Sequence, residues 1–499
     1  MGIKSTLVKP LAKYTAGSIR KWSRNAVAHQ ENIFKNLIKK GSNTSFGKDH
    51  DFANIHSYTD YTQRVPVRDY EALKMYFERV KDGESDVLWT GKPTYFAKTS
   101  GTTSGVKYIP ITKDSLPNHF GSARNMTFNY IAETGNSKFL DGKLIFLSGS
   151  PEMDMVNGIY VGRLSGISNH LIPNWLKSSQ MPSYTTNCIE DWEQKLDKIV
   201  EETAKEDMRM ISGIPPWVVM YYERLLEYTG KNHIIDIFPN FSLFAYGGVN
   251  FEPYRAKLEG MVGKKIDTLE TYPASEGFIA FQNEQNDPAL LLNSNSGIFF
   301  EFVPADEFFN ENPTRVSLRD VEIGVNYAII INSNAGLWGY NIGDTVRFTS
   351  KDPYKLLVTG RIKHFISAFG EHVIGKEVEE ALMTVANEEG IRIIEFTVAP
   401  QVNPPNGETP YHEWFIEFDN MPDNLEQFAK KVDTQVVRQN TYYKDLVDGN
   451  ILQTLKISPL RAGAFRDYMK SKGKLGGQNK VPRLSDDRKI AEVLEGFRL

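Results

Sequence analysis

Hydroxyl and glycine residues are concentrated in one stretch near residue 100. It reads Thr99-Ser-Gly-Thr-Thr-Ser-Gly-Val-Lys-Tyr108. Its two glycines let the backbone bend and approach a ligand closely, and successive N–H groups can form an anion nest. The pattern therefore indicates a phosphate-binding loop. The candidate residues are Ser100, Gly101, Thr102, Thr103, Ser104, Gly105 and Lys107. The glycine-to-lysine spacing does not fit a Walker loop, and an ordinary Ser/Thr/Gly surface loop is the alternative.

A second candidate motif reads Thr271-Tyr-Pro-Ala-Ser-Glu-Gly277 and follows a strand-like segment at 266–269. A carboxylate beside a hydroxyl at a strand end can hold Mg²⁺ and a phosphate oxygen. These roles would fall to Glu276 and Ser275, while the ring of Tyr272 could stack on a base. The alternative is a helix cap, with Ser275 at the helix start and Glu276 in its first turn.

A third candidate motif, Gly336-Leu-Trp-Gly-Tyr-Asn-Ile-Gly-Asp344, comes soon after an apolar run that ends at Ile331. Ligands of open α/β sheets bind beyond the carboxyl ends of the strands. Asp344 could accept hydrogen bonds from both hydroxyls of a ribose. The alternative is a Gly-Asp turn that enters a strand at 345–348.

Short apolar runs and helical patterns indicate the elements that position these motifs. The runs 144–147, 243–246 and 328–331 lack strict alternation, which is typical of strands buried on both faces of a largely parallel sheet. Residues 192–204 show helical spacing between them. Alternating strands and helices predict the α/β fold class.

The last third of the sequence has a different pattern. Helices are expected at 377–386 and 423–437, strands at 395–398 and 414–418, and a turn-rich loop at 401–410. We therefore expect a large domain over residues 1–359 and a small α+β domain over residues 360–499.

In this order and at these separations, the motifs resemble the adenylate-forming superfamily of acyl ligases. More narrowly, the chain resembles the Gretchen Hagen auxin-responsive acyl-acid amido synthetase family, in a form like its bacterial members. The resemblance covers nearly the whole chain. Further matching segments are Asn-Thr-Ser-Phe-Gly-Lys at 43–48, Val-Pro-Val-Arg-Asp-Tyr-Glu at 65–71, Tyr-Gly-Gly at 246–248, a hinge-like motif at 359–371, and Gly-Gly-Gln-Asn-Lys-Val-Pro-Arg at 476–483.

The resemblance implies a large multi-sheet N-terminal domain and a mobile C-terminal lid with a hinge near 360–366. It implies activation of a carboxylate by ATP and Mg²⁺ as an acyl-adenylate, with pyrophosphate release. The acyl group would then pass to an amine, expected to be an amino acid. An acyl–coenzyme A ligase and a degenerate nucleotide-binding protein without chemistry are the alternatives.

The resemblance also implies roles for individual residues. Lys480, Glu276 and Lys107 are the catalytic candidates, and Glu276 is also the expected magnesium ligand. The phosphate loop, Gly247, Gly248, Tyr272, Ser275, Asp344 and Arg361 would bind ATP or AMP. Arg163, Trp217 and Tyr340 are candidates for the acyl pocket.

Two residues depart from the family pattern. A single residue separates Gly105 from Lys107 where two are usual, which shifts the lysine by one position. Asn341 stands where many members carry arginine. The second departure is the best support for a degenerate member.

Composition limits the other possibilities. The 499 residues include 58 Lys and Arg against 62 Asp and Glu, a net charge of −4 that argues against nucleic acid as the main partner. One cysteine, Cys188, excludes an intrachain disulfide and favours a reducing compartment, so we expect a cytoplasmic protein. No apolar run reaches about 18 residues, so no membrane insertion is expected. No obligate protein partner is evident.

The first forty residues carry nine basic side chains and one acidic one, Glu31. A basic amphipathic segment can lie on an anionic membrane. The sequence pattern by itself favours the solvated face of an ordinary helix.

Overall fold

The computed structural model describes the chain apart from residues 1, 101–105, 173, 249–250, 363–364, 367–372, 406–407, 449–450, 476–479 and 486. The chain folds into two compact units. The first comprises residues 1–248 and 262–357, and the second comprises residues 249–261 and 358–499. The second unit thus includes a short segment from the middle of the chain, whereas the sequence-based division was a single cut at residue 360. The lid motion and the hinge stay predictions.

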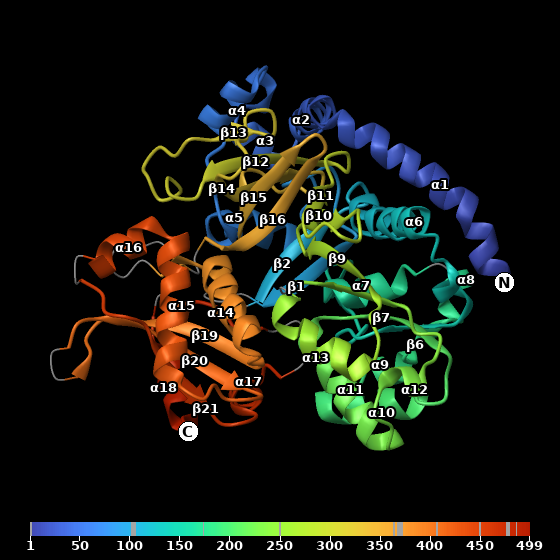
Figure 1. The fold of residues 1–499 in the computed structure, drawn as a ribbon. Coiled ribbons are helices and arrows are strands. Elements are labelled where there is room, and N and C mark those ends of the chain that lie inside the picture. Colours follow the sequence, from blue (N-terminus) through green and yellow to red (C-terminus); the bar gives the residue numbers. More distant parts are fainter. Residues whose placement is uncertain are drawn as a thin grey trace. The chain divides into compact units, whose positions relative to one another are not determined.

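A twelve-stranded sheet runs through the first unit (Figure 1). In spatial order its strands are β13 (Val316–Ser317), β12 (Ile298–Pro304), β14 (Asn326–Ser333), β15 (Tyr340–Lys351), β16 (Tyr354–Arg361), β11 (Leu290–Leu292), β10 (Gly277–Gln282), β9 (Asp267–Ala274), β8 (Leu243–Gly247), β7 (Met208–Ser212), β3 (Lys143–Phe146) and β6 (Gln180–Met181). The three apolar runs of the sequence form β3, β8 and β14, as predicted.

The sheet is mixed, so the expectation of a largely parallel sheet is correct for only part of it. Strands β6, β3, β7, β8 and β9 pair in parallel. Strand β14, in contrast, is antiparallel to both β12 and β15. Its residues Ala328–Ile331 are fully buried because both faces of the strand are covered. An apolar run in the sequence indicates that a strand is buried on both faces, but it does not indicate the direction of the neighbouring strands.

A smaller sheet of the first unit has the order β2-β1-β5-β4. Its strands are β1 (Tyr95–Ser100), β2 (Val106–Ile111), β4 (Asp154–Val156) and β5 (Ile159–Gly162). Strands β1 and β2 form an antiparallel hairpin in which Ser100 lies opposite Val106 and Thr99 opposite Lys107. The predicted phosphate loop therefore connects two paired strands.

Helices cover both sheets of the first unit (Figure 1). They are α1 (Ile3–Arg24), α2 (Ala26–Gly41), α3 (Ser45–Asp49), α4 (Tyr58–Arg64), α5 (Tyr70–Lys81), α6 (Ser122–Thr134), α7 (Leu164–His170), α8 (Asn174–Lys177), α9 (Tyr184–Asn187), α10 (Trp192–Thr203), α11 (Pro215–Thr229) and α12 (Ile234–Ile237), with shorter helical turns η1 (Phe52–Asn54), η2 (Pro117–Gly121) and η3 (Lys138–Asp141). The predicted helix at 192–204 is α10, and the Asp191 carboxylate caps it by accepting from Gln194 N at 2.8 Å. Within the described ranges, no helix combines the length and apolarity required to cross a bilayer.

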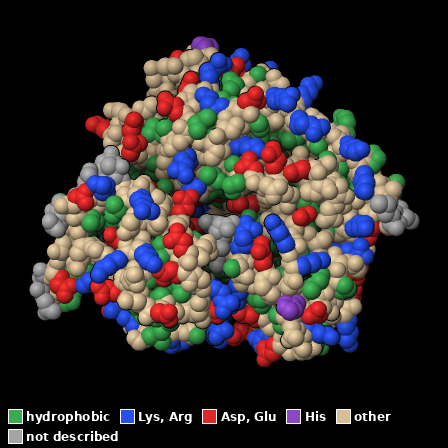
Figure 2. Space-filling model, viewed as in Figure 1, with side chains coloured by type: hydrophobic (Ala, Val, Ile, Leu, Met, Phe, Trp, Pro, Cys, Tyr) green, Lys and Arg blue, Asp and Glu red, His purple; other side chains and the backbone are tan. Residues whose placement is uncertain are grey.

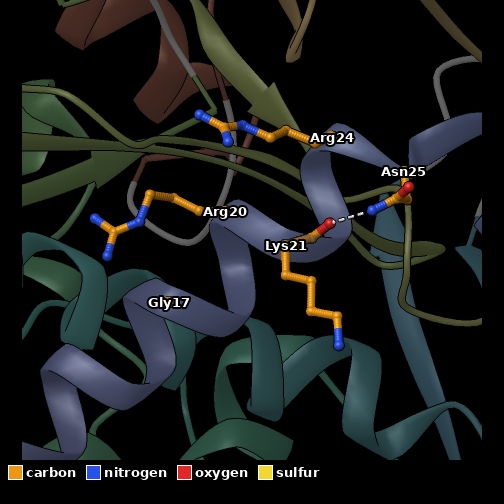
Figure 3. A pocket seen from close by; sticks show the side chains of 5 residues that line it. All are labelled: Gly17, Arg20, Lys21, Arg24 and Asn25. Atoms are coloured by element: carbon orange, nitrogen blue, oxygen red, sulfur yellow. Dashed lines mark hydrogen bonds between the residues drawn. The ribbon is translucent and has the colours of Figure 1, made fainter.

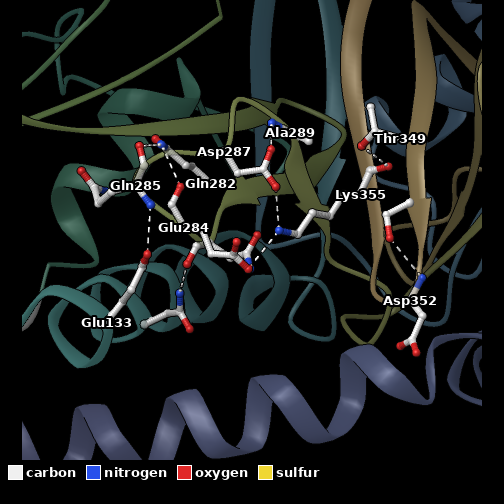
Figure 4. Close-up of polar contacts among 12 residues, drawn as sticks. Glu133, Gln282, Glu284, Gln285, Asp287, Ala289, Thr349, Asp352 and Lys355 are labelled. Carbon is white, nitrogen blue, oxygen red and sulfur yellow. Dashed lines mark hydrogen bonds and ion pairs between the residues drawn. The ribbon is translucent and has the colours of Figure 1, made fainter.

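A buried cation holds the middle of the large sheet together (Figure 4). Lys355 of β16 is only 6% exposed, and its Nζ donates to Glu284 Oε1 at 3.0 Å and Asp287 Oδ2 at 2.8 Å. Burial acts to lower the pKa of Lys355, but these two hydrogen bonds raise it above its ordinary value. Lys355 and its two carboxylate partners thereby fix the connection between β10 and β11 against β16.

The second unit is an α+β fold. It contains α13 (Glu252–Val262), β17 (Phe365–Ile366), β18 (Val373–Ile374), α14 (Gly375–Glu389), β19 (Ile393–Gln401), β20 (Tyr411–Phe418), α15 (Leu425–Gln439), α16 (Thr441–Asp448), β21 (Lys456–Leu460), α17 (Ala464–Ser471), α18 (Lys489–Leu494) and a helical turn, η5 (Glu495–Phe497). Strand β20 lies between β19, to which it is antiparallel, and β21, to which it is parallel. Helices α14 and α15 bury Leu382 and Val432 in the same core as Trp414 of β20. Both helices and both strands predicted in this region are present.

Candidate active site

The second motif forms the hairpin between β9 and β10. Tyr272 lies within β9, and Ser275 and Glu276 form the two-residue turn, because Ala274 pairs with Gly277 across it. The alternative of a helix cap is therefore wrong. The turn places the Ser275 hydroxyl and the Glu276 carboxylate next to each other at the end of a strand.

The buried side chain of Asn118 fixes this hairpin from outside the motif. Asn118 Oδ1 accepts from Phe278 N at 2.7 Å, and its Nδ2 donates to Phe278 O at 3.2 Å and Ser296 Oγ at 2.8 Å. Phe278 is two residues after Glu276, so the amide holds the start of β10 in place. No sequence pattern singles out this asparagine, because its partners lie about 160 residues away along the chain.

The second half of the third motif, Tyr340–Asp344, lies inside strand β15 and not in a turn before it, while residues 336–339 precede the strand. Ile330 pairs with Asn341 and Ala328 with Thr345, so extra residues form a bulge between Asn341 and Thr345. Gly343, at the bulge, has a φ of +87°, and its N–H donates to Asn341 Oδ1 at 2.8 Å. Asn341 thus stabilises the bulge that carries Asp344.

The second and third motifs meet through a tyrosine and an aspartate. Tyr272 Oη donates to Asp344 Oδ2 at 2.8 Å. Tyr272 is 7% exposed, whereas Asp344 is more accessible. The sequence separation of 72 residues hides this contact from pattern reading.

A second contact joins the same motifs. Tyr340 Oη donates to Glu276 Oε1 at 3.4 Å. Burial, and then the negative charge of Glu276, raise the pKa of Tyr340 well above its usual range. The phenol therefore stays protonated at neutral pH and can donate to a carboxylate.

The segment 65–71 brings the phosphate hairpin to this cluster. Tyr70, at the start of α5, accepts a hydrogen bond at its Oη from Tyr108 N of β2 at 3.0 Å. Lys107 Nζ lies 5.7 Å from the centre of the Tyr70 ring. The Tyr70 phenol also acts electrostatically on Tyr340. Tyr70 therefore contacts the strand that carries Lys107 and lies near enough to Tyr340 to affect its pKa, a role that the sequence did not reveal.

The main chain of the same segment supports β15. Arg68 N donates to Gly339 O at 2.9 Å, and Asn341 N donates to Arg68 O at 2.8 Å. The two bonds flank Tyr340 and fix its backbone. Gly339 N also donates to the buried Asn332 Oδ1 at 2.7 Å. The start of the third motif is thus held from two sides.

Gly247, a candidate for the adenine border, ends β8 opposite Thr271 of β9. A Cβ atom at this position would lie 2.4 Å from Thr271 Oγ1 and 2.5 Å from Thr271 O. The close pairing of the two strands therefore requires glycine, whatever the ligand. Gly248, the next residue, has a φ of +81°, which also favours glycine.

We expect Gly247→Ala to lower the free energy of unfolding by about 1–3 kcal/mol, because the added methyl group overpacks β8 against β9. Urea unfolding followed by circular dichroism measures the effect. Gly260→Ala in α13 is the matched control, since a Cβ there meets nothing within 4 Å. A destabilisation equal in both variants would contradict the steric account.

Several predicted residues cannot be placed in the same detail. Gly101, Thr102, Thr103, Ser104 and Gly105 lie outside the described residues. Ser100 belongs to β1, one residue before them. Their phosphate-binding role therefore stays a prediction, as does the effect of the shortened spacing before Lys107.

The three acyl-pocket candidates lie in different parts of the first unit. Tyr340 belongs to the cluster above. Trp217 of α11 is 4% exposed and packs on Trp192 of α10, with ring centres 4.8 Å apart. Arg163 is exposed at the start of α7, with its side chain beside Gly149. No contact among these three is recorded within the described residues, and the acyl pocket stays a prediction.

A buried lysine lies on the same helix as Trp192. Lys195 is 2% exposed, and its Nζ donates to Ser148 O at 2.9 Å and Asn187 O at 2.7 Å. Within the described part of the chain it has no carboxylate partner. Burial lowers the pKa of Lys195 to about 8.

The lowered pKa predicts a pH-dependent stability. A lysine in the unfolded chain loses its proton near pH 10.4, so above pH 8 the unfolded state binds more protons than the folded state. The free energy of unfolding should therefore rise between about pH 8 and 10, by roughly 1–3 kcal/mol relative to Lys195→Met. Urea unfolding of both proteins at several pH values measures this difference. Parallel pH profiles would disprove it.

The remaining candidates, Arg361 and Lys480, belong to the second unit. Arg361 is the last residue of β16, and Lys480 is exposed. The segment after Lys480 is firmly attached. Thr397 Oγ1 donates to Pro482 O at 2.7 Å, and Val398 N donates to Arg483 O at 3.0 Å. The segment thereby extends the sheet along the edge of β19.

The Arg483 side chain anchors this attachment. Its guanidinium donates to Glu379 Oε1 of α14 at 2.8 Å and to Glu395 of β19, and it stacks on the Phe396 ring at 4.7 Å. Tyr254 of α13 donates to Glu395 Oε2 at 2.7 Å. Both carboxylates and the guanidinium are mostly buried, so their charges are screened little by water. Three helical or strand elements therefore fix the backbone three residues after Lys480.

A magnesium ion fits this site only with help from a substrate. Over the described residues, no three His, Cys, Asp or Glu side chains gather as a metal cluster. Mg²⁺ at nucleotide sites is usually held by one or two carboxylates, with phosphate oxygens and water completing the shell. Glu276, partly exposed at its turn, meets that requirement as a single carboxylate.

Models of one protein family match most of this chain. The GH3 family N-terminal domain matches residues 15–266, the GH3 family central domain matches residues 291–361, and the GH3 family C-terminal domain matches residues 376–489. An indole-3-acetic acid-amido synthetase of Arabidopsis thaliana, GH3.3, is 21% identical over 96% of this chain and 92% of its own length. The jasmonoyl–L-amino acid synthetase JAR4 of Nicotiana attenuata is 20% identical over 92% of this chain and 91% of its own length.

Solved structures agree on the fold. The AtGH3.15 acyl acid amido synthetase, determined in complex with 2,4-DB, superposes with a TM-score of 0.80 at 16% identity, over 97% of this chain and 96% of that one. A 2-hydroxyisobutyryl-CoA ligase in complex with R3-HIB-AMP superposes with a TM-score of 0.56 at 14% identity, over 97% and 91% of the two chains. The expected fold, that of an adenylate-forming enzyme, is confirmed.

Proposed function

Because the chain belongs to the GH3 family, we propose that it is an ATP-dependent acyl-acid amido synthetase. The observation that carries the proposal is the pair of contacts Tyr272–Asp344 and Tyr340–Glu276, which join two distant motifs at one end of the large sheet. Both contacts lie within a chain that the three GH3 domain models match nearly throughout. The resemblance to bacterial members stays a prediction.

The first proposed step makes the carboxylate of an acyl acid electrophilic. A carboxylate oxygen attacks the α-phosphorus of ATP, the bond to the bridging oxygen breaks, and pyrophosphate leaves with the electron pair. The acyl-adenylate that results has AMP as its leaving group. Charge shifts among phosphate oxygens in this step, so positioning and electrostatic stabilisation supply most of the catalysis.

We assign the nucleotide-binding roles to residues around the two contacts. The Asp344 carboxylate accepts hydrogen bonds from the ribose hydroxyls, while Tyr272 keeps that carboxylate in place and borders the adenine with Gly247 and Gly248. The Ser275 hydroxyl donates to the α-phosphate. The phosphate loop between β1 and β2 and the Lys107 ammonium bind the phosphates. Glu276 would hold Mg²⁺, which when bound neutralises phosphate charge.

Tyr340 orients the metal-binding carboxylate in this assignment. Its protonated phenol donates to Glu276 Oε1 and so restrains the orientation of the carboxylate that would hold the ion. A side chain that contacts a metal ligand in this way typically tunes the orientation of that ligand.

We further propose that Lys480 supplies a positive charge to the α-phosphate during adenylation. Its segment is fixed to the second unit by Arg483 and β19, so the lysine would move together with that unit as a body. Motion of the unit about residues 360–366, with Arg361 as the pivot, would bring the charge to the site and withdraw it before the amine attacks. Attack of the amine on the acyl carbon then forms the amide, releases AMP and loses one proton.

One experiment tests the function directly. Pyrophosphate release is measured with ATP, Mg²⁺ and a panel of carboxylic acids, and the products are then identified by mass spectrometry after addition of mixed amino acids. An amide that appears only with an amino acid supports the synthetase. A thioester formed with coenzyme A would identify the protein as an acyl–coenzyme A ligase.

The same experiment addresses the degenerate alternative that Asn341 suggested. In the structure Asn341 Oδ1 holds the bulge at Gly343, so the substitution keeps the backbone of the third motif ordered without the arginine. Binding of ATP without pyrophosphate release for any acid would favour a non-catalytic protein.

The cytoplasm is the compartment that we propose, on the basis of the single cysteine.

A further inference from the structure

Helix α1 presents an exposed surface that the proposed enzymatic function does not use. The helix buries Val8, Ala12 and Ile19 on one side, where it packs against α6. A neighbouring side carries two leucines and a tyrosine at a spacing of four and three residues, so all three share one stripe. Leu7 is 72% exposed, Leu11 51% and Tyr14 77%.

Basic side chains flank this stripe, and acidic ones are absent from the helix. The sequence of α1 holds six Lys and Arg residues and no Asp or Glu. Lys4 donates to Ser179 Oγ at 2.7 Å. The other five have no ion-pair partner among the described residues. They are Lys9, Lys13, Arg20, Lys21 and Arg24.

The cations are grouped toward the C-terminal end of α1. Gly17, Arg20, Lys21, Arg24 and Asn25 line an open hollow there (Figure 3). Arg20 and Arg24, one turn apart, extend the same way from the helix, and Lys21 extends away from them (Figure 3). On the face seen in Figure 2, Lys and Arg side chains gather over α1 and α2 with apolar side chains among them. This part of the surface is strongly positive although the whole chain is slightly negative.

The helix is also fixed in place, so the stripe is presented without reorganisation. The Asp141 carboxylate accepts from Gly2 N and from Ser5 N, each at 3.1 Å, and so caps the first turn. Ser137 Oγ donates to Ser5 O at 2.9 Å. A rigid presentation lowers the entropy cost of binding a partner.

We propose that α1 docks the protein on an anionic phospholipid surface. In this arrangement Leu7, Leu11 and Tyr14 enter the boundary between head groups and acyl chains, while the cations contact lipid phosphates and carboxylates. The helix lies in the plane of the interface and does not cross the bilayer.

The charge pattern favours this occupant over others. A second copy of the chain would bring two helices of the same positive charge together. A long nucleic acid would meet the net negative charge of the remaining surface and would leave the leucines without an apolar partner. An anionic lipid surface satisfies both the cations and the leucines, since each cation near such a surface strengthens binding roughly fivefold.

Vesicle flotation with the full-length protein tests the proposal. We expect binding to phosphatidylcholine vesicles that contain phosphatidylserine, little binding to phosphatidylcholine alone, and weakening by sodium chloride. The triple change Leu7→Ser, Leu11→Ser and Tyr14→Ser should reduce binding about tenfold or more, as should the pair Arg20→Glu and Arg24→Glu.

Matched variants separate α1 from general surface effects. Met75→Ser, Met155→Ser and Tyr228→Ser remove exposed apolar side chains elsewhere, and Lys264→Glu with Lys265→Glu reverses exposed charges elsewhere. Both sets should bind vesicles as the wild type does. All variants alter exposed side chains, so their thermal unfolding should also match that of the wild type.

Three outcomes would overturn the proposal. They are absence of binding to phosphatidylserine vesicles, equal binding to neutral vesicles, and binding that the α1 variants leave unchanged. Tighter binding of labelled DNA or RNA through the same α1 residues would also count against it. These readouts need no enzymatic activity, so they remain interpretable if the proposed synthetase function fails.

Discussion

Lys480→Ala should lower the rate of acid-dependent pyrophosphate release by about 100- to 1,000-fold, the usual effect of removing one group that stabilises charge in a transition state. The KM for ATP should change much less, because the exposed lysine is proposed to act during the reaction and not in ground-state binding. Lys480→Arg should restore little activity, since a planar guanidinium does not replace a compact ammonium. Steady-state release of pyrophosphate measures both variants against the wild type.

The second half-reaction provides the control within the same protein. When a chemically prepared acyl-adenylate and an amino acid are supplied, Lys480→Ala should form amide at a rate close to that of the wild type. Lys474→Ala, which removes another exposed lysine from the same tail, should leave both half-reactions unchanged. An equal loss in both half-reactions would refute an adenylation-specific role for Lys480.

Asp344→Ala should raise the KM for ATP by roughly 10- to 100-fold, because hydrogen bonds to a charged group typically contribute about 1.5–3 kcal/mol. Tyr272→Phe should have a smaller effect, since the tyrosine orients the Asp344 carboxylate through a bond of 2.8 Å and contacts the ribose only through it. Initial rates at varied ATP concentration measure both changes. Asp306→Ala, which removes an exposed carboxylate from another loop, is the control.

Analogues of ATP make the second prediction specific to the ribose. The wild type should discriminate against 2′-deoxy-ATP, and Asp344→Ala should discriminate much less, because the partner of the missing hydroxyl is already absent. A variant that still discriminates as strongly as the wild type would show that the ribose is bound elsewhere.

The sequence predicted where several strands lie along the chain, but it did not predict the direction of their neighbours or the full extent of β15. The apolar runs gave β3, β8 and β14 because burial on both faces demands apolar residues in succession. They could not give the antiparallel direction of β14, which depends on how β12 and β15 are connected to it. Nor could they place Tyr340–Asp344 within β15, since Gly339 and Gly343 resemble turn residues, whereas Gly343 in fact allows a bulge inside the strand.

The candidate site shows the same limit. Tyr272, Glu276, Tyr340 and Asp344 were identified because their residue types suit nucleotide chemistry and their motifs resemble a known family. Tyr70 and Asn118 were missed, because their roles arise from single contacts between distant segments. A spacing rule detects residues that act within one motif, whereas a residue that supports another motif leaves no local pattern.

The insertion of α13 into the second unit has a consequence for how that unit can be handled and how it can move. The polypeptide passes between the units three times, after residues 248, 261 and 357. A fragment that begins at residue 358 would lack α13 and would leave Glu395 without its bond from Tyr254. The C-terminal region expressed from residue 358 should therefore be less stable than the same region within the intact protein. Because the chain passes between the units at three points, any rotation of the second unit must change the backbone near residues 248, 261 and 357 together.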